Sequence, residues 1–153
     1  MIIADTGFWV ALFDRKDAFY QLAYRRLGEL DEPLVTTLPV ITEVCHLLQK
    51  RVSNEKALAF MRSHRRGVFQ PLDLGEAHFP RIEELMCQYA NLPMDFADAS
   101  LVVLAEALGH GRILSTDRRD FGVYRWKNRY PFENLLLGEG LTHGLRAASL
   151  MVP

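Results

Sequence analysis

Short apolar runs that alternate with longer helical patterns are the feature that most constrains how this chain folds. The clearest runs are "MIIA" at residues 1–4, "LVTT" at 34–37 and "RILS" at 112–115. Residues 68–72 form a further strand candidate that contains Pro71, and a fifth strand is expected near Leu135. Strands separated by helices favour parallel pairing through right-handed crossovers. The alternation therefore predicts an α/β fold.

Helical spacing of apolar residues fills most of the sequence between these runs. Pro39 suits the first turn of one helix, and Asn54 can cap the next. The helices are expected at about residues 8–14, 17–30, 39–52, 54–67, 75–90 and 95–108. The length of 153 residues suits one domain, and no repeat or linker interrupts it. We predict a domain over residues 1–137 and a tail over 138–153, which contains three glycines.

Composition and charge argue against one class of protein, the general DNA-binding proteins. The chain is 49% apolar and 24% charged with a net charge of −1, so no overall basic field points to nucleic acid. Basic residues do cluster locally, as in Arg118-Arg119 and in the set Arg125, Lys127 and Arg129. Clusters of this kind are usually solvated surface. Bulk charge therefore argues against a general DNA-binding protein, but not against an enzyme with local basic contacts.

Cysteine usage and the N-terminus indicate where the protein works. Cys45 and Cys87 lie far apart, and no histidine or cysteine spacing matches a zinc site. The N-terminus has no positive region and carries Asp5 within its apolar stretch, which is a poor signal peptide. No apolar run is long enough to span a bilayer. We therefore expect a cytoplasmic protein with reduced thiols and no membrane association.

Two acids follow predicted strands. Asp5 ends the first strand, and Asp117 follows "RILS" in "RILSTD". The carboxyl ends of parallel strands meet at one edge of a sheet, where ligands gather. An aspartate after a strand also commonly caps the next helix. From position alone the two readings, a shared site or helix capping, stay open for each acid.

Two further acids lie on predicted helices. Glu43 borders the inward apolar stripe of the helix at 39–52, where it can lean over the sheet or extend to solvent. Asp98 lies in "ADASLVVLAEAL", a segment that is apolar on nearly every face, and an unpaired charge there is costly. The alternative for Asp98 is an interaction with free amides in the first turn, although Asp95 alone would cap that helix.

Carboxylates that converge from distant segments repel one another unless a cation lies between them. A hard divalent ion such as Mg²⁺ binds through a few carboxylates plus water, and can make a water molecule more acidic and neutralise a phosphate. Thr6 and Thr116 each stand beside one of the acids and could orient a ligand or a water molecule. The four acids therefore predict a metal site.

Four sequence pieces resemble the acidic pattern of PIN domains, and in particular the VapC-like toxins of bacterial toxin–antitoxin systems. They are "ADTGF", Glu43 in "ITEV", "FADASLVVLAE" around Asp98 and "ILSTDRRDF" around Asp117. The resemblance covers about residues 1–137. It implies a three-layer α/β/α sandwich with a central, mainly parallel sheet of four or five strands.

The resemblance also implies an activity and partners. The activity is a Mg²⁺- or Mn²⁺-dependent endoribonuclease; the implied partners are RNA, a small antitoxin that blocks the acidic cleft, and a second copy in a homodimer. Aromatic residues in the first two helices, Phe8, Trp9, Phe13, Phe19 and Tyr20, could leave one face for a partner or could all face the core. The residues carried over are Asp5, Glu43, Asp98 and Asp117 as catalytic and metal-binding acids, Thr6, Thr116, Asp95 and Asp120 as supporting residues, and Arg118 and Arg119 as RNA contacts.

Three other functions fit the sequence less well. A phosphatase that forms an aspartyl-phosphate should carry Asp-x-Asp after its first strand, but Gly7 occupies the second position. A phospho-accepting signalling domain should carry a lysine after a late strand, and no lysine lies between Lys56 and Lys127. The remaining alternative is a non-catalytic module that binds nucleic acid or a partner. The presence of all four acids argues against it.

Overall fold

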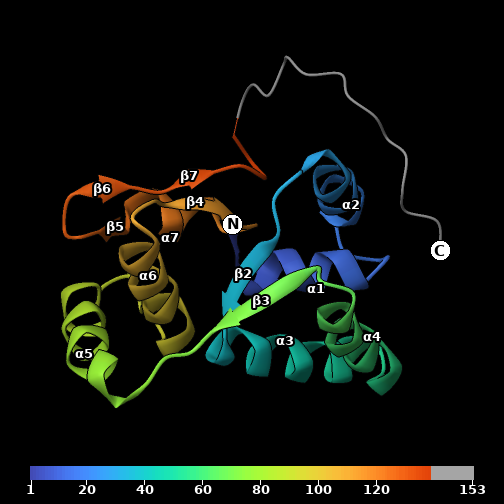
Figure 1. The fold of residues 1–153 in the computed structure, drawn as a ribbon, viewed down its shortest axis with the longest axis horizontal. Helices are drawn as coiled ribbons and strands as arrows, with labels where there is room; N and C mark the ends of the chain where they lie inside the picture. Colours follow the sequence, from blue (N-terminus) through green and yellow to red (C-terminus); the bar gives the residue numbers. More distant parts are fainter. Residues whose placement is uncertain (139–153) are drawn as a thin grey trace.

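A parallel sheet forms the centre of the computed structural model, which describes residues 1–138 (Figure 1). Its strand order is β3-β2-β1-β4-β7, and every neighbouring pair is parallel. The strands are β1 (Ile2–Ala4), β2 (Leu34–Thr37), β3 (Phe69–Leu72), β4 (Arg112–Leu114) and β7 (Glu133–Asn134). The prediction of an α/β fold with four or five mainly parallel strands is confirmed.

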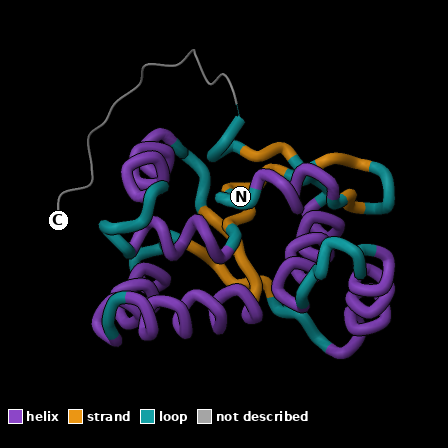
Figure 2. Tube along the Cα trace, turned by 180° about the vertical axis from the view of Figure 1, so that it is seen from behind, coloured by secondary structure: helices purple, strands orange, loops and turns teal. Residues whose placement is uncertain are grey.

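Helices cover both faces of this sheet. Helices α1, α2 and α4 lie on one side and α5 and α6 on the other, as the views from the front and from behind agree (Figures 1 and 2). Helix α3 contacts both α1 and α6, and so joins the two layers. The helices are α1 (Thr6–Phe13), α2 (Tyr20–Glu29), α3 (Leu38–Arg51), α4 (Asn54–Arg65), the 3₁₀ turn η1 (Glu76–His78), α5 (Phe79–Gln88), α6 (Phe96–Leu108) and α7 (Arg118–Val123).

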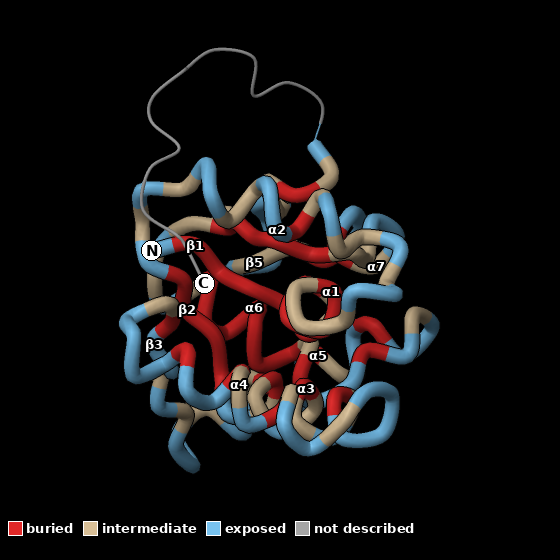
Figure 3. Tube along the Cα trace, turned by 90° about the vertical axis from the view of Figure 1, so that its right-hand side faces the viewer, coloured by how far each residue is buried: buried red, intermediate tan, exposed pale blue. Residues whose placement is uncertain are grey.

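The core lies where the strands meet the inner faces of the helices. Strands β1 and β2 and most of helix α6 are buried (Figure 3). On the other side of the sheet, Trp9 packs against Phe60 and Phe69 with ring centroids 5.3 and 5.1 Å away. Phe8 and Trp9 are fully buried, so these two aromatics of α1 face the core and leave no surface for a partner.

Several element boundaries differ from the sequence prediction. Asn54 is the first residue of α4, and the cap is Ser53, whose hydroxyl accepts a bond from the Lys56 amide at 3.2 Å. Helix α2 begins at Tyr20 because the Asp17 carboxylate accepts the Phe19 amide and forms a turn there. The segment 75–90 divides into η1 and α5. Helix α7 and the two-stranded sheet of β5 (Arg125–Trp126) and β6 (Tyr130–Pro131) were not predicted, because elements this short have no periodicity to read.

Part of the prediction falls outside the described residues. The tail expected at 138–153 lies there apart from Gly138. Within residues 1–138, no helix is both long enough and apolar enough to cross a membrane.

Candidate functional site

The ends of strands β1 and β4 bring Asp5 and Ser115 together. The pairing of the two strands continues past β1, since the Asp5 amide donates to the Leu114 carbonyl at 3.0 Å. The Ser115 hydroxyl then donates to Oδ2 of Asp5 at 2.8 Å and accepts the Asp117 amide at 3.0 Å. Asp5 is only 6% exposed. One serine therefore fixes a buried carboxylate and the start of the loop that carries the next acid.

Three of the acids also cap helices. Asp5 accepts the Thr6 amide at 2.6 Å, Asp95 accepts the Asp98 amide at 2.8 Å, and Asp117 accepts the Asp120 amide at 2.9 Å. The two readings left open by the sequence are thus compatible. Each of these caps uses one carboxylate oxygen for the helix. A carboxylate has about four lone-pair sites, so capping leaves acceptor capacity for a ligand even in Asp5, whose second oxygen accepts the Ser115 hydroxyl.

Asp98 is placed by helix α6 and by a tyrosine. The start of α6 is tied to the sheet by the Thr37 and Ser100 hydroxyls, 2.6 Å apart. The hydroxyl of Tyr124 donates to Oδ2 of Asp98 at 3.3 Å, and the ring of Tyr124 is fully buried. Ser100, a buried polar residue of this largely apolar helix, therefore links α6 to strand β2.

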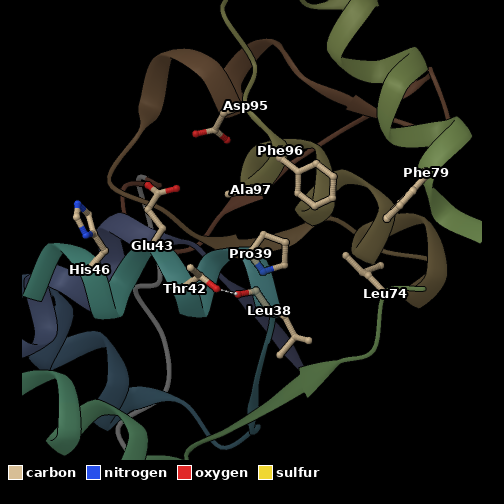
Figure 4. A pocket seen from close by; sticks show the side chains of 10 residues that line it. All are labelled: Leu38, Pro39, Thr42, Glu43, His46, Leu74, Phe79, Asp95, Phe96 and Ala97. Carbon is tan, nitrogen blue, oxygen red and sulfur yellow. Dashed lines mark hydrogen bonds between the residues drawn. The ribbon is translucent and has the colours of Figure 1, made fainter. Parts of the chain in front are cut away.

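Glu43 reaches the same region from the helix that joins the two layers. It lies on α3, and Figure 4 shows its carboxylate and that of Asp95 facing the same open space. The Thr6 hydroxyl lies near enough to Glu43 to lower the pKa of that carboxyl, although burial and the charge of Asp95 raise the pKa above its ordinary value.

These side chains line one cavity of about 520 Å³, which we call the acidic cleft. Four of its acids come from four separate segments of the chain: the residue after β1, α3, α6 and the loop after β4. The predicted residues that line it are Asp5, Thr6, Glu43, Asp95, Asp98, Thr116 and Asp117. Asp17 and Arg51, which were not predicted, also line it.

Burial and mutual repulsion perturb the carboxylates of the acidic cleft. Burial raises the pKa of Asp5 to about 6, although the hydrogen bonds that Asp5 accepts from the Ser115 hydroxyl and the Thr6 amide lower it. Burial also raises the pKa of Asp98 to about 8, with the charges of Asp95 and Asp5 adding to the shift. Perturbation of this kind, by burial plus specific charged neighbours in a cavity, is typical of functional sites.

The remaining predicted residues lie beside the cleft rather than in it. Burial and a shared hydrogen bond with Asp117 raise the pKa of Asp120. Arg118 donates to the carbonyl of Leu137 at 3.1 Å, and the largely exposed Arg119 lies 4.0 Å from Asp120. Neither arginine lines the cleft. The predicted RNA contacts of Arg118 and Arg119 would therefore lie outside the acidic cleft.

The donor set of the cleft fits a hard divalent cation held partly by water. All the converging donors are oxygens, and the buried hydroxyl of Thr6 has no hydrogen-bond partner of good geometry among residues 1–138. In the same part of the chain, no three histidine, cysteine, aspartate or glutamate side chains are arranged to hold a metal ion. Mg²⁺ usually binds through one or two carboxylates and keeps several water molecules. The residues present fit that mode of binding rather than an all-protein cage.

Gly7 allows the two sides of the cleft to meet. A Cβ atom at this position would collide with the Thr116 hydroxyl, because the first turn of α1 packs directly against the loop after β4. The glycine that counted against an aspartyl-phosphate enzyme therefore has a steric role.

A second cavity of about 690 Å³ adjoins the acidic cleft and shares Glu43 and Asp95 with it (Figure 4). We call it the apolar groove. Leu38, Phe79 and Phe96 line it and are about half exposed. The cleft therefore opens beside a surface suited to apolar contact.

Comparison with known proteins identifies the family and the fold. Residues 2–127 match the PIN domain family. This chain is a PIN domain. It is 27% identical over 124 residues to Ribonuclease VapC26 of Mycobacterium tuberculosis, a match that covers 81% of this chain and 92% of that protein. The crystal structure of M. tuberculosis VapC20, described as a sarcin-ricin loop cleaving toxin, superposes on this PIN domain with a TM-score of 0.72. That match has 21% identity and covers 78% of this chain and 92% of the other.

Sequence reasoning missed four residues of this site, which are Asp17, Arg51, Ser115 and Tyr124. Ser115 stood at the end of a predicted strand in "ILSTD", and the hydroxyl beside the acid was the available signal. Tyr124 and Arg51 gave no such signal, because their contact with the site depends on how α7 and α3 pack.

Proposed function

We propose that this PIN domain is a metal-dependent endoribonuclease and the toxin of a toxin–antitoxin pair. The observation that carries the proposal is the acidic cleft, where Asp5, Glu43, Asp98 and Asp117 come together from four segments. Three of these carboxyls, those of Asp5, Glu43 and Asp98, have raised pKa values. Such an arrangement is costly for stability unless a cation offsets the charge.

The cation would be Mg²⁺ or Mn²⁺, held by Asp5, Asp98 and Asp117 directly or through water. Bound there, it would neutralise charge on the phosphate and make a water molecule more acidic. Glu43, whose pKa is raised by burial, suits the role of accepting a proton from the attacking water. Thr6 and Thr116 would orient that water, and Arg51 is a cation at the cleft wall that could hold the RNA backbone.

RNA as the substrate rests on the relatives. Carboxylates and a divalent cation cleave phosphodiesters of either nucleic acid, so the cleft alone does not distinguish RNA from DNA. The relative VapC26 is named a ribonuclease, and VapC20 is described as a toxin that cleaves the sarcin-ricin loop. We therefore propose RNA as the substrate, and the cytoplasm as the place of action.

The test is cleavage of a panel of structured and unstructured RNAs by purified protein, with Mn²⁺ or with EDTA. The proposal expects cuts with Mn²⁺ and none with EDTA. Cleavage that persists in EDTA would contradict the metal mechanism. No cleavage of any RNA, together with no effect of Mn²⁺ on the melting temperature, would favour a non-catalytic binding module.

A protein inhibitor is the second part of the proposal. The apolar groove offers Leu38, Phe79 and Phe96 as contacts beside the acidic cleft, so one peptide could bind both surfaces and exclude RNA. A small protein encoded next to this chain should co-purify with it and suppress cleavage. If co-expression with each neighbouring small protein leaves cleavage unchanged, the antitoxin proposal fails.

A further inference from the structure

The β5–β6 hairpin, residues 125–131, carries basic and aromatic side chains, and none of its residues lines the acidic cleft. Its strands pair antiparallel, with Trp126 opposite Tyr130. Lys127 and Asn128 form the turn with φ angles of 51° and 56°, the left-handed region that a tight hairpin turn requires. Three of its seven residues, Arg125, Lys127 and Arg129, are cations, and none is acidic.

Aromatic rings and cations alternate on this hairpin. The rings of Trp126 and Tyr130 lie 4.6 Å apart between centroids, tilted by 33°. The Lys127 ammonium lies 5.7 Å from the Trp126 ring and the Arg129 guanidinium 5.4 Å from the Tyr130 ring. Tyr130, Lys127 and Arg129 are exposed. Rings that stack on bases, next to cations that contact phosphates, are the usual elements of a surface for single-stranded nucleic acid.

The hairpin is held in place by contacts at its turn and its base. The Lys127 amide donates to Glu106 of α6 at 2.5 Å, and Arg81 of α5 donates to the Asn128 side chain at 3.0 Å. The Trp126 indole donates to the Pro131 carbonyl at 3.2 Å and packs so closely on Gly111 that a Cβ atom there would collide with it. The backbone and the indole are therefore fixed, while the Lys127 and Arg129 side chains have no partner within residues 1–138 other than the rings.

The hairpin begins next to the acidic cleft. Tyr124, whose hydroxyl contacts Asp98, directly precedes Arg125. Glu106, which anchors the turn, lies eight residues after Asp98 on the same helix, about 12 Å along its axis. A strand with one phosphate in the cleft needs only a short further stretch to reach the turn.

We propose that the β5–β6 hairpin binds the single-stranded RNA that flanks the cut site, with bases on Tyr130 and Trp126 and phosphates on Lys127 and Arg129. This inference rests on the proposed ribonuclease function. The charge of the hairpin complements a phosphate backbone, whereas the acidic cleft alone would repel it. If the hairpin served only for packing, the contact of Trp126 with Gly111 would be enough, and the exposed cations Lys127 and Arg129 would have no role.

Binding of a uridine decamer in EDTA tests the hairpin without cleavage. Tryptophan fluorescence is the readout, because the chain has two tryptophans and Trp9 is fully buried, so quenching by RNA reports Trp126. The variant is Lys127→Glu/Arg129→Glu. The matched control is Arg62→Glu/Arg65→Glu, an equal change of charge at two exposed positions on α4.

The hairpin variant should bind the decamer about tenfold more weakly than the control. The slope of its log binding constant against log salt concentration should also be shallower than that of the control by about 1.4, the value for two lost phosphate contacts on a single strand. Tyr130→Ala should also weaken binding, by about tenfold, without changing the salt slope. Equal binding of the decamer by the hairpin variant and the control would overturn the proposal.

The outcome separates this inference from the proposed function. If the parent cleaves RNA but the hairpin variant and the control have the same KM, the inference is wrong and the ribonuclease function stands. If the parent cleaves no RNA yet the decamer binds through the hairpin, the ribonuclease function is wrong and the hairpin surface stands.

Discussion

The Ser115 hydroxyl donates to Oδ2 of Asp5 at 2.8 Å and accepts the Asp117 amide at 3.0 Å, so one side chain positions two acids of the cleft. The bond to Asp5 lowers the pKa of that carboxyl, against burial, which raises it to about 6. Ser115 is itself fully buried. It therefore acts through Asp5 and Asp117 as a positioning residue.

Ser115→Ala should weaken Mn²⁺ binding more at pH 6 than at pH 8.5. The alanine removes a bond that favours the ionised form of Asp5, so the pKa of Asp5 rises further and protons compete more strongly with the metal. The measurement is the dissociation constant of Mn²⁺ at several pH values. Ser115→Thr keeps the hydroxyl and should restore the parent values; equal Mn²⁺ binding by Ser115→Ala and the parent at pH 6 would show that the bond does not control Asp5.

Metal-free protein should lose stability as pH rises from 5 to 8.5. The pKa values of Asp5 and Asp98 are raised in the folded state to about 6 and about 8, from an ordinary 3.8. The folded state therefore binds more protons than the unfolded state, and this stabilisation is lost as pH rises through the folded values. Urea denaturation in EDTA at several pH values measures it. A free energy of unfolding that is flat or rises over this range would contradict the shifts.

The effect of Asp98→Asn on stability relative to the parent should change sign when metal is added. In EDTA at pH 8.5, above the Asp98 pKa of about 8, the variant should melt at the temperature of the parent or higher, because it removes one charge from a crowded site. With Mn²⁺ at about 100 times its dissociation constant, the parent should gain about 2.7 kcal/mol and the variant little. Asp31→Asn, at an exposed acid between α2 and β2, is the matched control and should respond to Mn²⁺ like the parent.

Phe79→Glu should weaken binding of the inhibitor. Phe79, 53% exposed, lies with Phe96 and Leu38 along the apolar groove that we assign to the inhibitor, and a carboxylate covered by an apolar contact there is costly. Phe79→Glu should co-purify with less of the neighbouring small protein than the parent does, whereas Tyr24→Glu, at a similarly exposed aromatic on α2, should retain as much. Equal retention by Phe79→Glu and the parent would contradict the groove as the inhibitor's site. The homodimer stays a separate prediction, which a monomeric parent by light scattering at micromolar concentration would contradict.

The sequence allowed most of the sheet and the main acids to be predicted. Asp5 and Asp117 follow strands that the apolar runs reveal, and an isolated charge marks Asp98 in an apolar helix. The contact between Ser115 and Asp5 joins residues 110 positions apart, and only the pairing of β1 with β4 creates it. Short elements escaped prediction because the β5–β6 hairpin depends on two left-handed turn residues rather than on a hydrophobic period.

The rate of RNA cleavage as a function of Mn²⁺ concentration, for the parent, Asp98→Asn and Asp31→Asn, tests the central claim most directly. The claim is that the acids of the cleft hold the metal that cleavage requires. Parent and Asp31→Asn should show the same saturable rise in rate with Mn²⁺, and Asp98→Asn should stay at background while remaining folded at the same temperature. An Asp98→Asn variant that cleaves RNA at the parent rate, or parent cleavage without dependence on Mn²⁺, would contradict the account.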